Sequence, residues 1–323
     1  MTASTSPGAG RGDTPVVGGS VLALTDQTPG AASGNPLRGG PRQWRRELGR
    51  LARAGFPAVD LTDGWLPVPG LSASELEQLG EVLSEVGVEA LGLNVSRHSL
   101  IDPERAQEHL DYSMRSVDAA AALGIPLLGV GFHPRLVEAQ RGHQMFWEVA
   151  VPPDDRSDET WAAATDRLRE LCTYAAGRGI EISIEIYEDT LVSTAADMDR
   201  IVTAVGAPNL GINPDLGNTY RSATPQRETW LTTLRGAIPH MDFWHVKNYT
   251  RASLSPQGPF AVAPTTLGTG GIDYRLGVKE VLAGGFRGPF VVEHYGGDAV
   301  EMQRLGREYL VRLLDELLEE AAA

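Results

Sequence analysis

The sequence predicts an α/β protein built as a closed barrel of eight parallel strands, each followed by a helix. Short apolar runs alternate with amphipathic segments along the chain after a 17-residue tail, and no linker-like break interrupts them. This alternation is typical of βα units around one parallel sheet. Eight runs favour closure into a barrel. One such barrel accounts for residues 18–323 as a single domain, because barrels of this class commonly exceed about 250 residues.

The predicted strands are apolar on both faces, as expected where helices cover a sheet outside and side chains fill it inside. They cover residues 20–25, 58–62, 89–95, 126–132, 181–187, 210–213, 242–247 and 289–293. An open, doubly wound sheet is the alternative. It is disfavoured because TDQTPG follows the first strand where a glycine-rich phosphate-binding fingerprint would stand.

Helical periodicity fills the intervals between these strands. The predicted helices cover residues 41–54, 72–86, 103–123, 158–178, 194–205, 225–237, 274–283 and 300–320. Ser72 and Glu75 form a capping-box pattern at the start of the second helix. Two connections, 133–156 and 248–271, are long, and in a barrel both lie at the C-terminal end of the strands, where ligands bind.

Charge and composition exclude several classes of function. The chain has 28 Lys and Arg residues against 42 Asp and Glu residues, a net charge of −14. An acidic surface repels phosphate backbones and anionic lipids, so neither nucleic acid nor a membrane is an expected partner. The single cysteine, Cys172, excludes an internal disulfide framework and favours the cytoplasm. Residues 1–17, rich in small and polar residues, are predicted to be a disordered tail.

Four potential metal ligands fall at or near the ends of consecutive predicted strands: Glu185, Asp215, His245 and Glu293. In a closed barrel these positions converge on one axis. Three carboxylates and one imidazole suit a divalent ion that prefers oxygen, so we expect one ion, Mn²⁺ first, with Mg²⁺ or Co²⁺ as alternatives. Each residue alone would make an ordinary ion pair, but an uncompensated carboxylate cluster inside a barrel is costly.

The segments IEISIEIYEDT, LGINPDLGN, FWHVKNYTR, LGTGGIDY and GPFVVEHYGG resemble the sugar phosphate isomerase/epimerase superfamily of xylose-isomerase-like TIM barrels, in order and spacing. The resemblance covers essentially the whole chain after the tail. It implies that the four residues named above bind one divalent metal ion. It also implies a substrate-binding role for Arg251, which stands six residues after His245, where ketose 3-epimerases carry an arginine.

Two positions depart from the epimerase pattern. Asn218 stands where a substrate-binding histidine normally follows the metal-binding aspartate by three residues. Leu191 stands where a glutamate would follow Glu185 by six. These departures argue against epimerisation of a free ketose, and Asn218 becomes a candidate substrate ligand of a different kind.

The expected chemistry begins at a sugar carbonyl. A metal ion that binds the carbonyl and a neighbouring hydroxyl makes the adjacent proton acidic, and a basic side chain then removes that proton. Candidate bases are Glu185, Glu293 and two loop histidines, His133 and His143. Lys247, on the same strand face as His245, could bind a substrate oxygen or pair with a nearby carboxylate.

Several aromatic residues near strand ends or in the long loops suit sugar rings or flat aglycones, although ordinary packing explains each one alone. They are Trp65, Phe146, Trp147, Tyr187, Tyr249 and Tyr295.

Within the superfamily, YEDT, NPDLGN, HVKNYTR and EHYGGD most resemble the large subunit of bacterial C-glycoside deglycosidases. That resemblance implies a lyase that cleaves 3-oxo-C-glycosides to aglycone and sugar, together with a small β-rich partner subunit. Alternatives are an isomerase or epimerase acting on a ketose, sugar phosphate or inositol derivative, and a non-catalytic sugar-binding subunit. We also expect an oligomer. The DNA-repair endonucleases of the same barrel need more histidines than the seven present and a basic surface.

Overall fold

The computed structural model describes residues 14–25, 39–141, 143, 145–149, 151–222, 226–253 and 260–322. Eight parallel strands make one sheet. They are β1 (Val17–Ser20), β2 (Ala58–Thr62), β3 (Glu89–Asn94), β4 (Leu127–Gly131), β5 (Glu181–Glu185), β6 (Leu210–Asn213), β7 (Trp244–Val246) and β10 (Phe290–Val292). Most of the predicted N-terminal tail lies outside the described residues.

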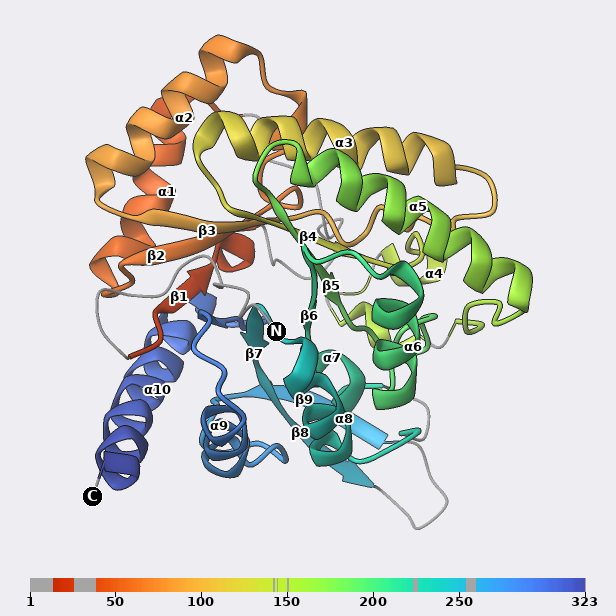
Figure 1. Cartoon of the computed structure of the whole chain (residues 1–323). Helices are drawn as coiled ribbons and strands as arrows, with labels where there is room; N and C mark the ends of the chain where they lie inside the picture. The colour runs from red at the N-terminus through yellow and green to blue at the C-terminus, as the bar shows by residue number, and fades with distance from the viewer. Residues whose placement is uncertain are drawn as a thin grey trace.

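The strands follow the order β6-β5-β4-β3-β2-β1-β10-β7, and helices surround them (Figure 1). Strands β6 and β7 are the two edges of this sheet. An isolated parallel bridge between Ile212 and Met241 joins them, so the barrel is nearly closed. Among the described residues, no helix is long and apolar enough to cross a membrane.

The predicted helices lie close to their expected ranges, and two short helices, Glu138–Arg141 and Leu216–Tyr220, were not predicted. They are α1 (Pro41–Arg53), α2 (Ala73–Val86), α3 (Ala106–Leu123), α4 (Glu138–Arg141), α5 (Asp158–Ala176), α6 (Ala195–Val205), α7 (Leu216–Tyr220), α8 (Trp230–Ala237), α9 (Tyr274–Ala283) and α10 (Ala299–Ala322). The capping box of Ser72 and Glu75 is confirmed at the start of α2. Helix α8 begins after Thr229, whose side chain accepts from the Thr232 amide.

The prediction for the first strand was wrong. The strand occupies Val17–Ser20, and the apolar residues Val21–Leu24 form a 3-10 helix that the Ser20 side chain caps. The strand contains Gly18, where a Cβ atom would lie 2.8 Å from Leu91 Cδ1. This close approach explains the glycine, which lowers the strand signal in the sequence.

The connection 248–271 is more regular than predicted. Strands β8 (Asn248–Ser253) and β9 (Phe260–Thr265) pair antiparallel within it, from Asn248 opposite Thr265 to Ser253 opposite Phe260. The connection 133–156 includes α4 and the 3-10 helix Phe146–Glu148. Both connections lie at the ends of barrel strands.

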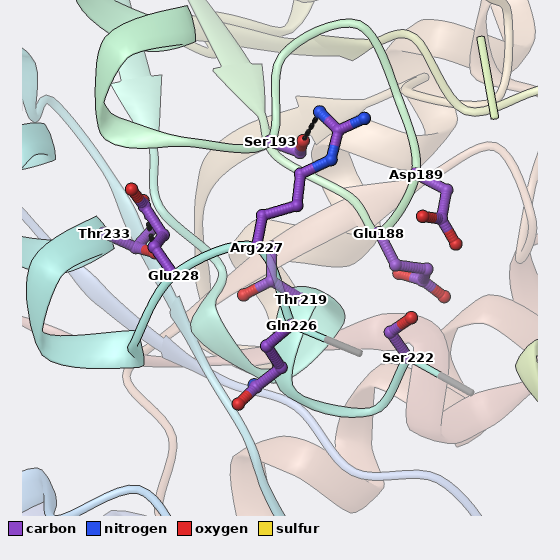
Figure 2. Close-up of a pocket in the computed structure, with 9 residues that line it drawn as sticks. All are labelled: Glu188, Asp189, Ser193, Thr219, Ser222, Gln226, Arg227, Glu228 and Thr233. Carbon is purple, nitrogen blue, oxygen red and sulfur yellow. Dashed lines mark hydrogen bonds between the residues drawn. The ribbon is translucent and has the colours of Figure 1, made fainter. Parts of the chain in front are cut away.

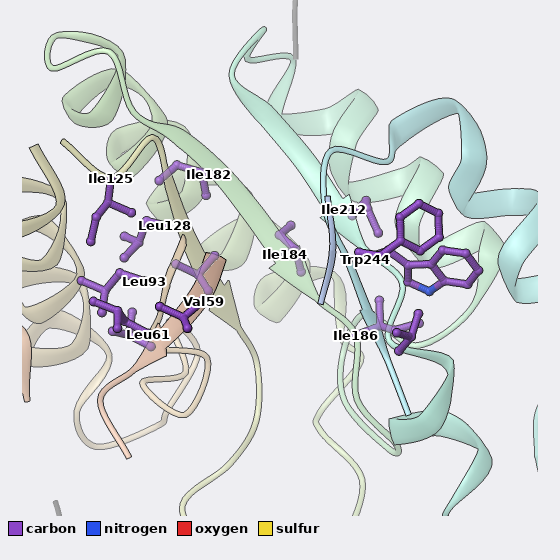
Figure 3. Close-up of a cluster of buried hydrophobic side chains, with 14 of the residues drawn as sticks. Val59, Leu61, Leu93, Ile125, Leu128, Ile182, Ile184, Ile186, Ile212 and Trp244 are labelled. Atoms are coloured by element: carbon purple, nitrogen blue, oxygen red, sulfur yellow. The ribbon is translucent and has the colours of Figure 1, made fainter. Parts of the chain in front are cut away.

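Alternation along the strands separates the core from the barrel interior. Ile182 and Ile184 of β5 belong to the large apolar cluster between sheet and helices, with Ile186 beside them (Figure 3). Ser183 and Glu185 therefore face the interior, because successive strand side chains point to opposite faces.

A smaller apolar layer fills part of the barrel interior. Its members are Ala58, Leu91, Leu127, Phe243 and Val291. Side chains two residues apart on a strand point to the same face. His245 therefore shares the interior face with Phe243, and Glu293 shares it with Val291. These two polar residues consequently lie one step beyond the layer, toward the C-terminal ends of the strands.

Candidate metal centre

The four predicted ligands converge at the C-terminal ends of β5, β6, β7 and β10. Glu185 ends β5, Asp215 follows β6 by two residues, His245 is the middle residue of β7, and Glu293 directly follows β10. One ligand atom from each lies within 4.8 Å of the others, and all four side chains are buried. We call these four residues the metal centre.

The donor set of the metal centre fits a divalent ion. His245 Nδ1 is buried without a hydrogen-bond partner among the described residues. Two carboxylate oxygens face it, Glu185 Oε1 at 3.4 Å and Glu293 Oε1 at 3.7 Å. An imidazole nitrogen surrounded by carboxylate oxygens is the arrangement expected of ligands around an oxygen-preferring cation.

Asp60, on β2, orients the imidazole. Its Oδ2 lies 3.0 Å from His245 Nε2, so the other ring nitrogen faces the metal centre. Burial raises the pKa of Asp60, opposed by the hydrogen bond and charge of His245. A carboxylate behind a ligating histidine fixes the ring orientation and its basicity. Asp60 was not predicted from the sequence, where its only signal is a charge inside the apolar strand AVDLT.

We predict that Asp60→Asn lowers metal affinity roughly 10–100-fold, because the carboxylate partner of the histidine is lost. Metal titration by calorimetry measures this change. Asp63→Asn is the matched control, since Asp63 pairs at 3.1 Å with His98, outside the metal centre. Equal metal affinity in Asp60→Asn and the unmodified protein would show that Asp60 does not support the ligand.

Lys247 forms the salt bridge that the sequence left open as an alternative. Its Nζ lies 2.6 Å from both Asp215 Oδ2 and Glu293 Oε2. Burial lowers the pKa of Lys247, but the charges of Asp215 and Glu293 outweigh it and hold the pKa well above its usual value. The ammonium is therefore charged and partly neutralises the carboxylates.

The carboxylates of the metal centre differ in their electrostatics. Burial disfavours ionisation of Glu185, yet the charges of His245 and Lys247 and the bonds that Glu185 accepts lower its pKa below the usual range. Burial raises the pKa of Asp215 to about 7, although Lys247 opposes the shift. Burial also acts to raise the pKa of Glu293, but the charges of Lys247 and His245 outweigh it and lower the pKa below its usual value. Glu185 and Glu293 are thus carboxylates at neutral pH.

Two asparagines hold Glu185 in place. Asn94 Nδ2 donates to Glu185 Oε2 at 2.6 Å, and Asn218 Nδ2 donates to Oε1 at 2.9 Å. Asn218 also donates to the Ile186 carbonyl at 3.1 Å. The predicted substrate ligand Asn218 thus contacts a metal ligand. Asn94, at the end of β3, was not anticipated from the sequence.

The two candidate histidines differ in location. His133 is buried, and its Nδ1 lies 2.7 Å from the Pro134 carbonyl. Burial lowers its pKa to about 3, helped by the charges of Arg97 and Arg221. His133 is therefore neutral and weakly basic. His143 is exposed, and its backbone amide donates to the Gln140 carbonyl at 3.0 Å.

Arg251 lies on the hairpin strand β8 rather than at a barrel strand. Its side chain is half-buried, and Nη1 donates to the Tyr220 carbonyl at 3.3 Å. Burial lowers the pKa of its guanidinium. The contacts of Arg251 connect the hairpin to the end of α7.

Arg221 is a further residue that the sequence analysis missed. Its side chain is fully buried and donates to both oxygens of Glu188, at 3.0 and 3.4 Å. Four rings surround the guanidinium carbon at 4.4–5.9 Å, and we call them the aromatic box. They are Phe146, Trp147, Tyr187 and Tyr295.

The loop after β4, which supplies Phe146 and Trp147, is bound to the loop after β5. The Leu191 amide donates to Asp154 Oδ2 at 2.8 Å, and the Asp154 amide donates to the Asp189 carbonyl at 3.0 Å. Arg156 donates to the Thr190 and Leu191 carbonyls at 3.3 and 2.8 Å. These hydrogen bonds hold the loop after β4 against the loop after β5.

Asp154 makes this attachment pH-dependent. Burial raises its pKa to about 6, above the roughly 3.9 of an unfolded aspartate, so its stabilising contribution is complete below pH 3.9 and is lost as the pH rises through 6. Asp154→Asn should remove this dependence, about 1 kcal/mol between pH 4 and 7 after screening, in urea unfolding. Asp315→Asn, at an exposed position on α10, is the control. An unchanged pH profile in Asp154→Asn would contradict the assignment.

A small polar cavity has Glu188, the partner of Arg221, in its wall. Its volume is about 30 Å³. Figure 2 shows its lining residues, with Arg227 donating to Ser193 and Thr233 donating to Glu228. The wall also includes Asp189, whose φ of 58° is positive.

Comparison with known proteins identifies the family to which this geometry belongs. The model of xylose isomerase-like TIM barrels matches residues 48–314. The chain belongs to the xylose isomerase-like TIM barrel family. This result confirms the fold class predicted from the sequence.

A xylose isomerase-like TIM barrel protein from Mycobacterium smegmatis, solved in complex with magnesium, is 31% identical. The match covers 94% of this chain and 98% of that chain, with a TM-score of 0.83. An L-ribulose 3-epimerase structure is 14% identical, covering 96% and 97% of the two chains at a TM-score of 0.67, which shows the fold alone.

An inosose dehydratase from Serratia proteamaculans (strain 568) is also similar to this xylose isomerase-like barrel. The two sequences are 26% identical over 150 residues. This alignment covers 42% of the chain and 48% of the dehydratase, about half of each protein. The sequence relative is thus named a dehydratase, and the epimerase shares the fold.

Proposed function

We propose that the protein is a divalent-metal-dependent enzyme of the carbohydrate isomerase, epimerase or dehydratase type. In this proposal it acts on a ketone-bearing sugar or inositol derivative and removes the proton next to the carbonyl. The observation that carries the proposal is the buried metal centre, whose ligand atoms lie within 4.8 Å of one another at the C-terminal ends of the strands. Active sites of such barrels lie at this end.

Different residues have different roles in the proposed reaction. A bound divalent ion would polarise the substrate carbonyl and raise the acidity of the adjacent proton. Glu185 and Glu293, ionised at neutral pH, are the candidate bases. Asn94 and Asn218 hold Glu185, and Asp60 holds His245.

His133 has a different role in this proposal. Because its Nδ1 is bonded to the Pro134 carbonyl and it stays neutral, it suits contact with a substrate hydroxyl better than proton removal. Lys247 and Arg251 remain proposed substrate ligands, and exposed His143 is the weakest candidate base. Mn²⁺ is the proposed ion, with Mg²⁺ supported by the magnesium complex of the Mycobacterium smegmatis relative.

Cleavage of 3-oxo-C-glycosides with a small β-rich partner subunit is the second candidate. The aromatic box favours it, since flat rings suit an aromatic aglycone. The relatives favour the isomerase, epimerase or dehydratase class instead. Both reactions begin with loss of the same kind of proton and diverge afterwards.

The test is proton exchange in D₂O with metal-loaded protein. Ketoses, inososes and 3-oxo-C-glycosides are incubated separately, and NMR follows deuterium at the carbon next to the carbonyl. We expect exchange together with an epimerised, isomerised or dehydrated product. Aglycone release would select the lyase candidate. Metal-loaded protein that leaves all three classes unchanged would contradict the proposed function.

A further inference from the structure

Arg221 has a donor that the fold does not use. Glu188 accepts from Nε and Nη2, whereas Nη1 has no hydrogen-bond partner among the described residues. The side chain is 0% exposed, so bulk water does not satisfy this donor. A guanidinium only donates hydrogen bonds, and buried donors are normally paired.

Two more buried donors beside Arg221 share this property. In the part of the chain that the structure describes, neither Trp147 Nε1 nor Tyr249 Oη has a hydrogen-bond partner. The Trp147 ring lies 4.4 Å from the Arg221 guanidinium carbon, and its centroid lies 5.6 Å from that of Tyr249. Trp147 and Tyr249 are 3% and 1% exposed. Three unpaired donors thus lie around one ring.

This donor group adjoins the metal centre. The Tyr295 ring lies 5.6 Å from the Arg221 guanidinium carbon and 5.5 Å from Lys247 Nζ, which contacts two of the metal-centre carboxylates. Tyr187, two residues after Glu185, lies 5.9 Å from the same guanidinium. One aromatic ring, that of Tyr295, therefore lies between Arg221 and Lys247.

We infer that Arg221, Trp147 and Tyr249 bind a carboxylate of the substrate, at the end of the molecule remote from the metal centre. This inference rests on the proposed function and narrows its substrate to a sugar acid. A carboxylate only accepts hydrogen bonds, so it matches a set of donors. A sugar hydroxyl also carries a proton to donate, so a set of donors matches it less completely than it matches a carboxylate.

Charge supports the same ligand. Arg97 lies 4.9 Å from the Phe146 ring centroid, the same distance as Arg221. Two guanidinium groups thus contact one ring of the box in a protein whose net charge is −14. Glu188 neutralises one of these two charges, so one net positive charge remains beside this ring to attract an anion.

The test measures binding without turnover. Methyl β-glucuronide and methyl β-glucoside differ only by a carboxylate in place of the terminal hydroxymethyl group, and neither has a free carbonyl. Calorimetry on the full chain, with Mg²⁺ and with EDTA, should show the glucuronide bound at least roughly tenfold more tightly in both conditions. Equal binding of the pair, or a preference that disappears with EDTA, would overturn the inference.

Variants test which residues cause the preference for the glucuronide over the glucoside. Tyr249→Phe and Trp147→Phe remove one donor each while keeping a ring, and each should reduce the preference severalfold with little effect on glucoside binding. Tyr174→Phe is the matched control, because the Tyr174 hydroxyl pairs with Asp118 on the outer helices. Equal weakening of both ligands would show a packing effect and overturn the assignment.

The outcomes separate this inference from the proposed function. Metal-dependent proton exchange on neutral ketones, without carboxylate preference, overturns the inference alone. A carboxylate preference without exchange on any ketone overturns the proposed function alone.

Discussion

Replacing Glu185 with Gln is expected to remove bound metal and lower turnover roughly 10²–10⁴-fold, the usual contribution of a positioned acid or base. The amide keeps the shape of the side chain but loses the charge that His245 and Lys247 stabilise. Its NH₂ group also faces one of the two asparagines, Asn94 or Asn218, both of which now donate to the carboxylate. Metal content by mass spectrometry and deuterium exchange on substrate measure the two effects.

Glu181→Gln is the matched control for this substitution. Glu181 begins the strand that Glu185 ends, so it tests the same chemical change away from the metal centre. His245→Ala should reproduce the loss of metal and turnover. Full activity of Glu185→Gln after metal removal and controlled re-addition would refute the assigned centre.

Lys247→Met is expected to destabilise the metal-free protein by about 3–5 kcal/mol, the usual cost of breaking a buried ion pair. The ammonium lies 2.6 Å from Asp215 and from Glu293, and the substitution leaves both carboxylates without that cation. A divalent ion supplies replacement charge, so added Mg²⁺ should restore more stability to Lys247→Met than to the unmodified protein. Urea unfolding in EDTA and in Mg²⁺ gives both free energies.

The control is Lys279→Met, an exposed position on α9. It should behave as the unmodified protein does, with or without metal. If Lys247→Met unfolds at the same urea concentration as the control in EDTA, the ammonium does not compensate the metal centre.

The sequence predicted the barrel and the convergence of four candidate ligands at the strand ends, because strand-end residues in a barrel obey a simple period. Once the strand containing EISIE is placed, Glu185 must end it on the interior face. Asp60 was not predicted, because its partner, His245, lies 185 residues away and only closure of the barrel brings them together.

Arg221 was not predicted from the sequence for a related reason. Its environment comes from Phe146 and Trp147 after β4, Tyr187 after β5 and Tyr295 after β10. No periodicity within one segment encodes a contact among loops. The glycine-containing first strand shows the same limit, since Gly18 lies against Leu91, which is distant in the chain.

The metal centre lies across the junction between β6 and β7, the two edges of the sheet. These edges are joined by the Ile212–Met241 bridge, and the His245 amide donates to Asn213 Oδ1 at 2.8 Å. Asp215 belongs to one edge and His245 to the other, so an ion bound by both would fasten the seam of the barrel. Removal of a bound ion should therefore speed amide hydrogen exchange first along β6 and β7, because an ion held by both edges would stabilise the barrel wall as well as supply chemistry.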